Sequence, residues 1–423
     1  MPHIESWIPV PRGSDFSIYN LPYGAFARGI GAAHLGVAIG TQILDLHALA
    51  SAGLLDDICD RGVFQQPTLN AFLALGRAVW RQTRLRIAAL LRTDDAADGR
   101  LRALDVSKFF VEQSQARMVV PVAIGDYVDF YSSMQHATNL GKIFRPNGEP
   151  LTENWRHLPI GYHGRASTIV IDGTPVMRPQ GQRKPPGSSA PTFGPSTRLD
   201  IELEIGFITG PGNRLGHPIP AAKAREHIFG LVLVNDWSAR DIQAWEYQPL
   251  GPFLGKSFAT TISPWIVPLD ALDPFALTPP VQQPEPLPYL QAHGRWAYDI
   301  HLEVDLQSAK MRKAGLAPQT ISRTNFKEMY WTMAQQLAHV TINGTAMRPG
   351  DLYASGTISG STPESYGSFI ELTWNGERPL ELAGGERRAF LEDGDTVTLR
   401  GWCEAGEYRV GFGRASGTIS PAR

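Results

Sequence analysis

Apolar and polar residues alternate along most of the second part of the chain, a pattern that predicts β-strands. In residues 199–207 (LDIELEIGF), apolar side chains occupy every second position and acids occupy most of the others, as in a strand with one buried face. Residues 228–234 (IFGLVLV) are apolar throughout, which is typical of a strand buried on both faces. Residues 394–402 (GDTVTLRGW) also predict a strand. We therefore expect strands separated by turns to dominate after residue 120.

Helical spacing is strongest in the first part of the chain. Apolar residues recur three or four positions apart over residues 69–91, behind a Pro-Thr start signal, which predicts a helix. Residues 37–46 predict a strand leading into a turn, and residues 94–99 predict a loop. Later in the chain, a helix is predicted over residues 325–339, with Asn325 as the candidate cap. The change of pattern places a domain boundary near residue 120.

Two stretches of the second part lack a clean period. Residues 178–195 and 273–288 are rich in Pro, Gly, Ser and Gln. In a compact protein, loops of this length are functional segments or mobile insertions. We expect both stretches to be loops of this kind.

The composition agrees with a turn-rich β protein. The chain has 42 glycines and 33 prolines among 423 residues, which exceeds the average usage of about 7% and about 5%. Both residue types weaken helix interiors, so long helical bundles are disfavoured. With 43% hydrophobic and 19% charged residues, the chain is nevertheless expected to fold around a core.

Charge and cysteine content limit the partners and the location. The 39 basic and 41 acidic residues give a net charge of −2 without a long basic run, which argues against a nucleic acid or an anionic membrane as partner. The N-terminal residues do not resemble a secretory signal, and no apolar run approaches the roughly 20 residues that a membrane span needs. Cys59 and Cys403 are too few to stabilise a chain of this length by disulfide bonds, and they are expected to be reduced. We predict a soluble, cytoplasmic protein.

Acidic residues form the first candidate site. Glu202 and Glu204 fall on the same side of the predicted strand, about 7 Å apart, and for this strand in isolation a solvated outer face is the favoured interpretation. However, Asp236 follows the buried strand of residues 228–234, where a carboxylate is well placed to project into a cleft, and Asp129 lies at the start of the second part. Four such oxygen donors suit Ca²⁺ or Mg²⁺ better than zinc. The spacing alone does not show that they converge, so both interpretations stay open.

Several familiar catalytic motifs are absent. Residues 251–257 (GPFLGKS) are one residue too short for a phosphate-binding loop, and residues 255–259 (GKSFA) lack the last glycine of a nucleophile elbow. There is no His-Glu-x-x-His sequence for a zinc peptidase. Nucleotide hydrolysis, serine-esterase chemistry and zinc-peptidase chemistry are therefore disfavoured.

His136 is the candidate base. It follows Asp129 by seven residues in a segment rich in hydrogen-bonding side chains, and histidine is the usual base at neutral pH. A lone histidine is more often a structural residue, so its context alone leaves the role open.

Six segments together resemble the fumarylacetoacetase (fumarylacetoacetate hydrolase) family. They occur in the family's order across nearly all of residues 120–423, and the first part of the chain is compatible with it. The segments are residues 129–139 (DFYSSMQHATN), 159–167 (PIGYHGRAS), 199–204 (LDIELE), 235–243 (NDWSARDIQ), 249–258 (PLGPFLGKSF) and 348–360 (RPGDLYASGTISG).

The resemblance implies a fold and a reaction. The fold is mainly β (α+β), with a small N-terminal SH3-like barrel domain over residues 1–119 and a large mixed β-roll domain over residues 120–423. The reaction is the hydrolysis of a carbon–carbon bond in 4-fumarylacetoacetate to fumarate and acetoacetate, the last step of tyrosine and phenylalanine catabolism. The resemblance also implies a homodimer.

The resemblance further assigns roles to individual residues. It implies a metal site for Ca²⁺ or Mg²⁺ at Asp129, Glu202, Glu204 and Asp236, and a second Mg²⁺ position at Lys256 and Thr260. Lys256 would contact that Mg²⁺ through its backbone carbonyl, because an ammonium group has no lone pair, and its side chain would remain free for catalysis. The implied catalytic residues are His136 as base, Glu371 as its partner, and Arg240, Gln243 and Lys256 as stabilisers of developing negative charge. The implied substrate contacts are Tyr131, Arg145, Tyr162, Gln243, Tyr247 and Thr357.

Alternatives remain for some of these residues and for the activity. Arg240 could instead pair with Asp241 or another acid, and Glu371 alternates with apolar neighbours as an outward strand residue would. Ala259 replaces a glycine that is usual in the family beside the second metal position. The alternative functions are a related acylpyruvate hydrolase or β-keto acid decarboxylase, and a non-catalytic metal-stabilised binding protein.

Overall fold

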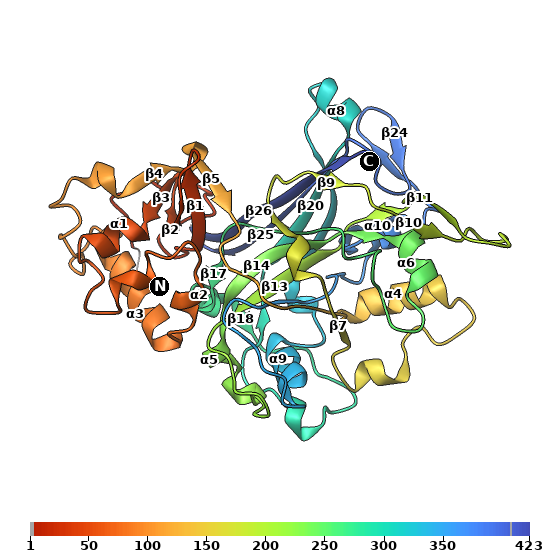
Figure 1. Cartoon of the computed structure of the whole chain (residues 1–423), viewed down its shortest axis with the longest axis horizontal. Helices are drawn as coiled ribbons and strands as arrows, with labels where there is room; N and C mark the ends of the chain where they lie inside the picture. Colours follow the sequence, from red (N-terminus) through yellow and green to blue (C-terminus); the bar gives the residue numbers. More distant parts are fainter. Residues whose placement is uncertain (1–3, 407) are drawn as a thin grey trace.

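The protein consists mainly of strands, arranged as a small N-terminal sheet beside a larger C-terminal domain (Figure 1). The structure is a computed structural model that describes residues 4–406 and 408–423. The mainly β, mixed α+β fold class predicted from the sequence is confirmed.

The N-terminal sheet curls into a half-barrel with the strand order β4-β3-β2-β1-β5. Its strands are β1 (Tyr23–Arg28), β2 (Ala33–Ile39), β3 (Gln42–Asp45), β4 (Phe110–Glu112) and β5 (Ala116–Val119). The predicted strand of residues 37–46 is therefore the end of β2, a turn and β3. Asp45 then caps the helix α1 (Leu46–Ser51) by accepting a hydrogen bond from the Ala48 backbone N–H.

The predicted helix of residues 69–91 is interrupted. It consists of α2 (Asn70–Leu73) and α3 (Arg77–Leu91), separated at Gly76. Gly76 has φ +82°, a conformation that glycine adopts readily and that an α-helix does not contain. The apolar spacing continues across the break because both helices bury their apolar residues in the same core, and spacing alone did not show the break.

The main sheet of the C-terminal domain has the order β7-β6-β22-β13-β14-β16-β8, with β17 also paired to β14. Its centre is the antiparallel pair β13–β14. All residues of β14 are buried, as its continuous apolar sequence predicted. The strands are β6 (Tyr127–Phe130), β7 (Gly161–His163), β8 (Ile169–Ile171), β13 (Leu203–Thr209), β14 (Ile228–Asp236), β16 (Thr260–Ile262), β17 (Val267–Pro268) and β22 (Leu352–Ala354).

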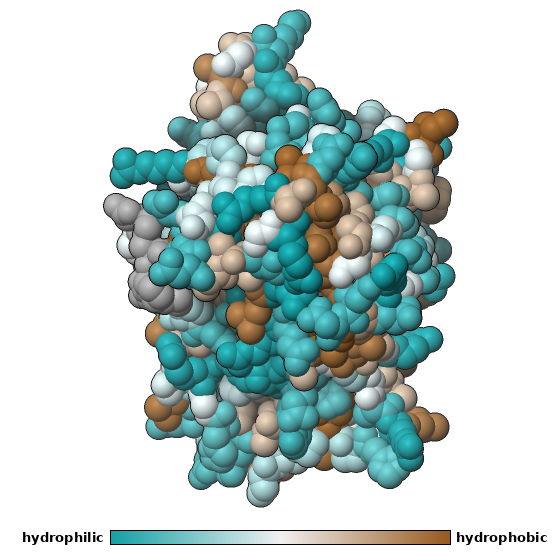
Figure 2. All heavy atoms as spheres, turned by 90° about the vertical axis from the view of Figure 1, so that its left-hand side faces the viewer, coloured by the Kyte–Doolittle hydropathy of each residue, from teal (hydrophilic) through white to brown (hydrophobic). Residues whose placement is uncertain are grey.

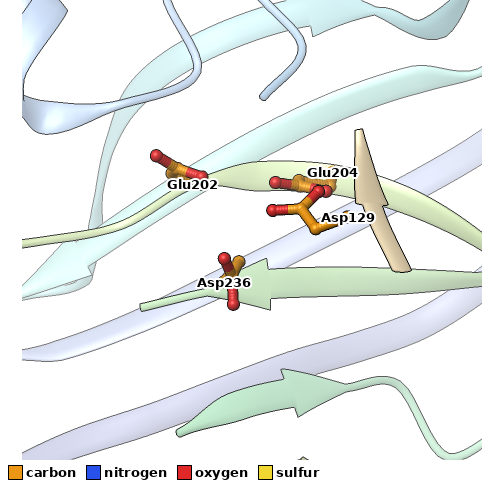
Figure 3. A group of neighbouring side chains, drawn as sticks. All are labelled: Asp129, Glu202, Glu204 and Asp236. Atoms are coloured by element: carbon orange, nitrogen blue, oxygen red, sulfur yellow. The ribbon is translucent and has the colours of Figure 1, made fainter. Parts of the chain in front are cut away.

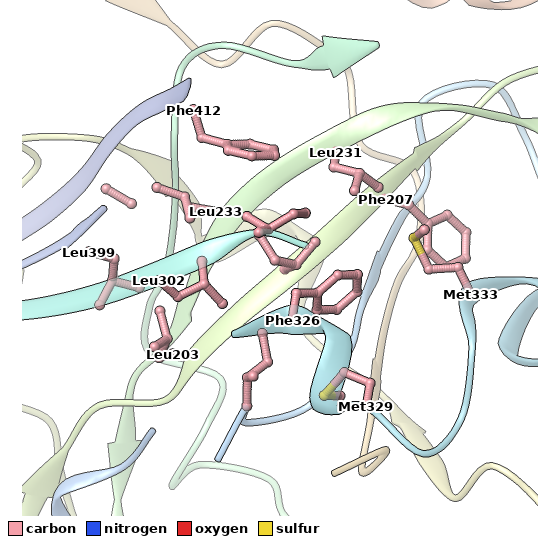
Figure 4. Packing of buried hydrophobic residues seen from close by; sticks show 14 of the residues in the cluster. Leu203, Phe207, Leu231, Leu233, Leu302, Phe326, Met329, Met333, Leu399 and Phe412 are labelled. Carbon is pink, nitrogen blue, oxygen red and sulfur yellow. The ribbon is translucent and has the colours of Figure 1, made fainter. Parts of the chain in front are cut away.

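A second sheet packs against the main sheet and closes the core. Leu231 and Leu233 of β14 lie in the same apolar cluster as Leu302, Leu399 and Phe412 of the second sheet (Figure 4). The second sheet has the order β21-β20-β25-β26-β9, formed by β9 (Val176–Met177), β20 (His301–Gln307), β21 (Gln319–Asn325), β25 (Thr396–Ala405) and β26 (Tyr408–Ser420). The strand predicted for residues 394–402 is thus confirmed as part of β25.

Short strand pairs and helices complete the larger domain. The strand pairs are β10 (Gln180–Arg183) with β11 (Thr192–Pro195), β12 (Leu199–Asp200) with β15 (Ser238–Ala239), β18 (Ala276–Leu277) with β19 (Ala297–Tyr298), and β23 (Leu380–Leu382) with β24 (Glu386–Arg388). The helices are α4 (Met134–Phe144), α5 (Ala224–His227), α6 (Arg240–Glu246), α7 (Leu269–Leu272), α8 (Ala309–Lys313), α9 (Met333–Thr341) and α10 (Phe369–Leu372).

Two sequence-based predictions need correction here. Residues 178–195 were expected to be an irregular loop, but they form the β10–β11 hairpin, which protrudes from the domain (Figure 1). The helix predicted from Asn325 begins only at Met333, because Thr332 and Gln335 form a capping box at that point. Asn325 instead caps a separate short 3₁₀ turn, Phe326–Glu328. Its side chain accepts a hydrogen bond from the Lys327 backbone N–H.

The N-terminal sheet is joined to the larger domain by backbone pairing and by apolar contacts. Tyr23 of β1 pairs with Ile266, and Phe16 pairs with Val410 of β26. The face of the molecule on the N-terminal side is mostly hydrophilic, with scattered apolar residues (Figure 2). Among the described residues, none of the helices combines the length and the apolar character needed to cross a membrane.

We expect Leu231→Ala to lower the free energy of unfolding by about 2–5 kcal/mol, because it leaves a cavity between the two sheets. Leu215→Ala is the matched control, since Leu215 is 81% exposed and should change stability by less than about 0.5 kcal/mol. Urea unfolding followed by circular dichroism measures both variants. Equal stability of the two variants would show that β14 is not central to the core.

Candidate active site

A cavity of about 470 Å³ lies in the larger domain and brings together most of the predicted site residues. The predicted residues that line it are Asp129, Tyr131, His136, Arg145, Tyr162, Glu202, Arg240, Tyr247, Lys256 and Thr357. The other predicted residues do not line the cavity, but they lie close to residues that do. They are Glu204, Asp236, Gln243, Thr260 and Glu371. All the side chains proposed from the sequence therefore belong to one region.

Neighbouring strands place four acids side by side. Asp129 lies on β6, Glu204 on β13 and Asp236 at the end of β14, while Glu202 directly precedes β13. Each of the four acids offers a carboxylate oxygen, and these oxygens lie within 4.8 Å of one another (Figure 3). All four acids are buried, so the interpretation of Glu202 and Glu204 as a solvated outer face is wrong.

Two cations neutralise one side of this acidic cluster. The Lys256 Nζ lies 2.5 Å from a Glu202 oxygen and 2.8 Å from an Asp236 oxygen. The Arg240 guanidinium lies 2.7 Å from the other Glu202 oxygen. Burial alone would raise the pKa of Glu202, but Lys256 and Arg240 lower it to about 2. Glu202 is therefore ionised at neutral pH despite its burial.

Asp129 and Glu204 lack such a cation partner within the described part of the chain. Asp129 Oδ1 and Glu204 Oε1 are buried and make no hydrogen bond to any described residue. Burial and the charge of Asp236 raise the pKa of Asp129, and burial and the charge of Asp129 raise the pKa of Glu204. Buried carboxylate oxygens without partners, in a group of four acids, fit the ligand preference of a hard divalent cation. The cluster could therefore hold a metal ion.

Lys256 and Thr260 both contact the Asp236 carboxylate. The Thr260 hydroxyl donates a hydrogen bond of 2.8 Å to Asp236 Oδ1, while the Lys256 ammonium binds Oδ2. The Lys256 side chain was expected to be free, but it is engaged in two ion pairs. Ala259, which directly precedes β16, is buried.

His136 and Glu371 form a buried pair at the cavity wall. His136 lies in the first turn of α4, where Ser133 caps the helix. Its Nδ1 lies 2.7 Å from Glu371 Oε2, and its ring makes a T-shaped contact with the ring of Tyr131. This contact leaves Nε2 as the ring nitrogen available to a second partner.

Glu371 is held by further hydrogen bonds that the sequence did not suggest. Its carboxylate accepts hydrogen bonds from Asn139 Nδ2 and from the hydroxyls of Ser359 and Ser368, at 2.7–2.9 Å. Burial opposes ionisation of Glu371, but His136 and these donors lower its pKa. Glu371 is on the short helix α10, so its interpretation as an outward strand residue is wrong. Asn139 could have been found from its position one helical turn after His136.

Arg240 is oriented by carboxylates other than its sequence neighbour. Its Nε donates a hydrogen bond of 2.7 Å to Asp200, and another nitrogen donates to the Gln243 side chain at 3.2 Å. Asp241 instead accepts hydrogen bonds from Ser196 and Thr197, so a pair of Arg240 with Asp241 is wrong, whereas the alternative of a pair with another acid is confirmed by Asp200 and Glu202. Asp200 was grouped with the other alternating acids of its segment, and its contact with Arg240 was not anticipated.

The predicted substrate contacts surround the cavity. The Tyr162 hydroxyl donates to Asp236 Oδ2 at 2.8 Å, and the Thr357 hydroxyl is buried with no partner among the described residues. Tyr247 is 44% exposed, and the Arg145 guanidinium donates to the Pro150 carbonyl. The cavity thus has polar groups beside the acids and an Arg at a solvent-accessible position.

Two models of known protein families match this chain. The model described as "Fumarylacetoacetase N-terminal" matches residues 19–121, and the model described as "Fumarylacetoacetate (FAA) hydrolase C-terminal" matches residues 127–419. The chain belongs to the fumarylacetoacetate hydrolase family.

Its similarity to curated members of this family extends over the whole length. The chain is 54% identical to human fumarylacetoacetase over 424 residues, and 51% identical to that of Arabidopsis thaliana, with 99% of each chain covered in both cases. A solved fumarylacetoacetate hydrolase from Exiguobacterium antarcticum superposes with a TM-score of 0.53 at 17% identity, covering 95% of this chain and 100% of that one. That last likeness concerns the fold alone.

We expect a divalent cation to stabilise the metal-free chain, because only the folded state brings the four acids together. Ca²⁺ or Mg²⁺ at 100 times its Kd should raise the free energy of unfolding by about 2.7 kcal/mol. Thermal unfolding of chelator-treated protein, with and without the cation, measures this effect. Glu204→Gln should reduce the shift, whereas Glu404→Gln, on the exposed part of β25, should preserve it. An equal shift in both variants would place the cation elsewhere.

Proposed function

We propose that this chain is a fumarylacetoacetase that hydrolyses a carbon–carbon bond of 4-fumarylacetoacetate, releasing fumarate and acetoacetate in the last step of tyrosine and phenylalanine catabolism. The observation that carries the proposal is the buried His136–Glu371 pair beside a four-acid cluster, in a chain 54% identical to human fumarylacetoacetase. A base and a cation site in one cavity are suited to the hydrolysis of a ketonic carbon–carbon bond, because the base can activate water and the cation can stabilise the developing enolate.

Asp129, Glu202, Glu204 and Asp236 would hold Ca²⁺ or Mg²⁺. Bound there, the ion would stabilise the enolate-like form of the diketone and polarise its carbonyl oxygen. The orphaned oxygens of Asp129 and Glu204 support this assignment, and the hydroxyl of Tyr162 supports the orientation of Asp236. A second Mg²⁺ beside Lys256 and Thr260 belongs to the same proposal.

His136 acts as the general base. It takes one proton from water, and the resulting hydroxide adds to the carbonyl carbon of the fumaryl group. Glu371 remains ionised and supports the imidazolium that forms, as a carboxylate on the far nitrogen does in other histidine bases. When the carbon–carbon bond breaks, its electron pair stays on the acetoacetate carbon. The imidazolium proton is then returned to that carbon, so that both products leave complete.

Arg240, Gln243 and Lys256 stabilise the negative charge that develops during the reaction. Both cations line the cavity, and their contacts with Glu202 fix them before substrate binds. Gln243 acts through its hydrogen bond to Arg240 and as a substrate contact.

The remaining cavity residues bind the substrate. Arg145 is a suitable clamp for a substrate carboxylate because its planar fork matches two oxygens. Tyr131, Tyr162, Tyr247 and Thr357 supply hydroxyl groups around the chain of the diketone. Phe130, Leu140 and Ile160 add the apolar wall that the fumaryl double bond requires.

The alternative activities receive less support. Curated relatives at 48–54% identity over nearly the whole chain are called fumarylacetoacetase, which disfavours an acylpyruvate hydrolase or a β-keto acid decarboxylase. A structural ion needs no base, so the His136–Glu371 pair also disfavours a non-catalytic binding protein.

The proposal includes a cytoplasmic homodimer with domains over residues 1–119 and 120–423. Cys59 and Cys403 are free thiols, as expected in a reducing compartment. Large apolar side chains are exposed on the β10–β11 hairpin and in the segment after α6, at Phe193, Leu250 and Phe253, which supports burial against a second copy. Sedimentation equilibrium should give twice the chain mass of 46.4 kDa, and a monomer at all concentrations would contradict the dimer.

Turnover of 4-fumarylacetoacetate tests the proposed function directly. We expect metal-loaded protein to remove the absorbance of the substrate and to release one fumarate for each molecule consumed. Cleavage of acylpyruvates with no effect on fumarylacetoacetate would instead assign the chain to the wider superfamily.

We expect His136→Ala to lower kcat by about 10²–10⁴-fold, because the general base is lost. The cation-dependent rise in unfolding temperature should remain, since His136 is not among the four acids. His217→Ala, in an exposed loop, is the matched control and should retain full turnover. Loss of both the cation effect and the fold in His136→Ala would make His136 a structural residue.

A further inference from the structure

Asp200 is a fully buried carboxylate that contacts two separate parts of the proposed catalytic site. It lies on β12, is 0% exposed and takes no part in the acidic cluster. Its Oδ2 accepts a hydrogen bond of 2.7 Å from Arg240 Nε, and its Oδ1 accepts one of 2.6 Å from the Phe369 backbone N–H. A buried charge with this many partners is fixed in place by the surrounding structure.

The first part that Asp200 contacts is the guanidinium of Arg240. The pairing of β12 with β15 sets Asp200 opposite Ser238, two residues before Arg240. Asp200 holds Nε on one side, and Glu202 lies 2.7 Å from a terminal nitrogen on the other. Two carboxylates therefore fix the plane of the guanidinium, and loss of either would let it rotate.

The second part is the helix that carries Glu371. The first N–H groups of a helix have no partner within it, and the residue before α10, Ser368, makes no side-chain cap. Its hydroxyl donates to Glu371 instead. Asp200 replaces the missing cap from 169 residues away, by accepting hydrogen bonds from the backbone N–H groups of Phe369 and Ile370.

We propose that Asp200 is a positioning residue that sets the charge-stabilising Arg240 and the His136–Glu371 pair at a fixed distance from each other. The inference rests on the proposed function and adds a residue to its machinery. One rigid carboxylate joins the two groups, because β12 holds its backbone and its side chain has no contact with solvent. Since a misplacement of about 1 Å can cost about 100-fold in rate, a shared anchor of this kind controls kcat without touching substrate.

Asp200→Asn tests this role against a matched control in the same chain. The amide keeps the shape of the side chain, but its NH₂ group would face N–H donors, from which it cannot accept a hydrogen bond. Asp395→Asn is the control, because Asp395 is also 0% exposed, binds an arginine (Arg388) and accepts a backbone N–H (that of Glu392). None of these contacts involves a residue that lines the cavity.

We expect Asp200→Asn to lower kcat about 100-fold with a KM within about 3-fold of the wild type. Both variants should lower the unfolding temperature, and Asp395→Asn should retain the wild-type kcat. Equal loss of kcat in the two variants, or wild-type kcat in Asp200→Asn, would overturn the inference. If the wild type itself fails to cleave fumarylacetoacetate, the proposed function is rejected instead, so the two failures are distinguishable.

A double-mutant cycle separates positioning from a general defect. In a Glu371→Gln background, Asp200→Asn should lower kcat by less than about 10-fold further, because the group it positions is already impaired. A full 100-fold further loss would mean that Asp200 acts independently of Glu371 and would reject the inference. If Asp200→Asn does not fold, Asp200→Glu keeps the charge but displaces the carboxylate by one methylene. It should lower kcat at least 10-fold, and wild-type kcat there would overturn the inference.

Discussion

The burial of carboxylates beyond the number of cations that can neutralise them is the constraint on which this site depends. Six acids, Asp129, Asp200, Glu202, Glu204, Asp236 and Glu371, are buried around the cavity. Among the described residues, the cations in contact with them are Arg240, Lys256 and, when protonated, His136. An excess of buried negative charge is costly unless protons or a metal ion balance it. The excess of buried carboxylates over cations therefore favours the binding of a metal ion at the four-acid cluster, which could hold one.

The main sheet makes this arrangement possible by bringing distant segments together at the ends of β6, β13 and β14. Asp129 pairs in register with Ala354 of β22, and Gly206 of β13 pairs with Ala354 from the other side, so a small residue separates the two acid-bearing strands. The next turn brings Gly356 to Glu204, where its N–H donates a hydrogen bond of 2.9 Å. Gly356 has φ +78°, and a Cβ there would lie 2.2 Å from the Phe130 carbonyl oxygen, so only glycine suits this turn. The high glycine content of the sequence thus has a specific use beside the acids.

Local patterns in the sequence predicted the elements better than the contacts between them. The continuous apolar run of β14 gave the centre of the sheet, because burial on both faces leaves its mark on that strand alone. The alternation over residues 199–207 predicted one strand with a single buried face, which is wrong: the segment is divided into β12 and β13, and every residue of β13 is buried. The helix over residues 325–339 was predicted with the wrong start, since the capping box at Thr332 and Gln335 decides the boundary and the apolar spacing does not. The strands of the β10–β11 hairpin pair largely through backbone hydrogen bonds and are partly exposed, so they carry no hydrophobic period.

The site shows the same division. Spacing identified Glu202 and Glu204 as neighbours but left open whether they face solvent, because the residues that contact them, such as Lys256 and Gly356, are far away in the sequence. His136 and Glu371 are 235 residues apart, so no local pattern could pair them, and the family resemblance alone suggested the pair. The contacts of Asp200 with α10 and Arg240 could not be predicted from the sequence, because they form only in the folded chain.

The most direct test of the charge constraint is calorimetric titration of the metal-free protein with Ca²⁺ in two buffers of different ionisation enthalpy. At pH 6 an ordinary carboxyl group is already ionised, but burial and neighbouring charge raise the pKa of Asp129 and Glu204. Because a cation binds ionised carboxylates, we expect its binding to displace protons that these two acids hold, so the measured heat should depend on the buffer and report proton release for each ion bound. Binding without proton release, or no binding at all, would contradict the account.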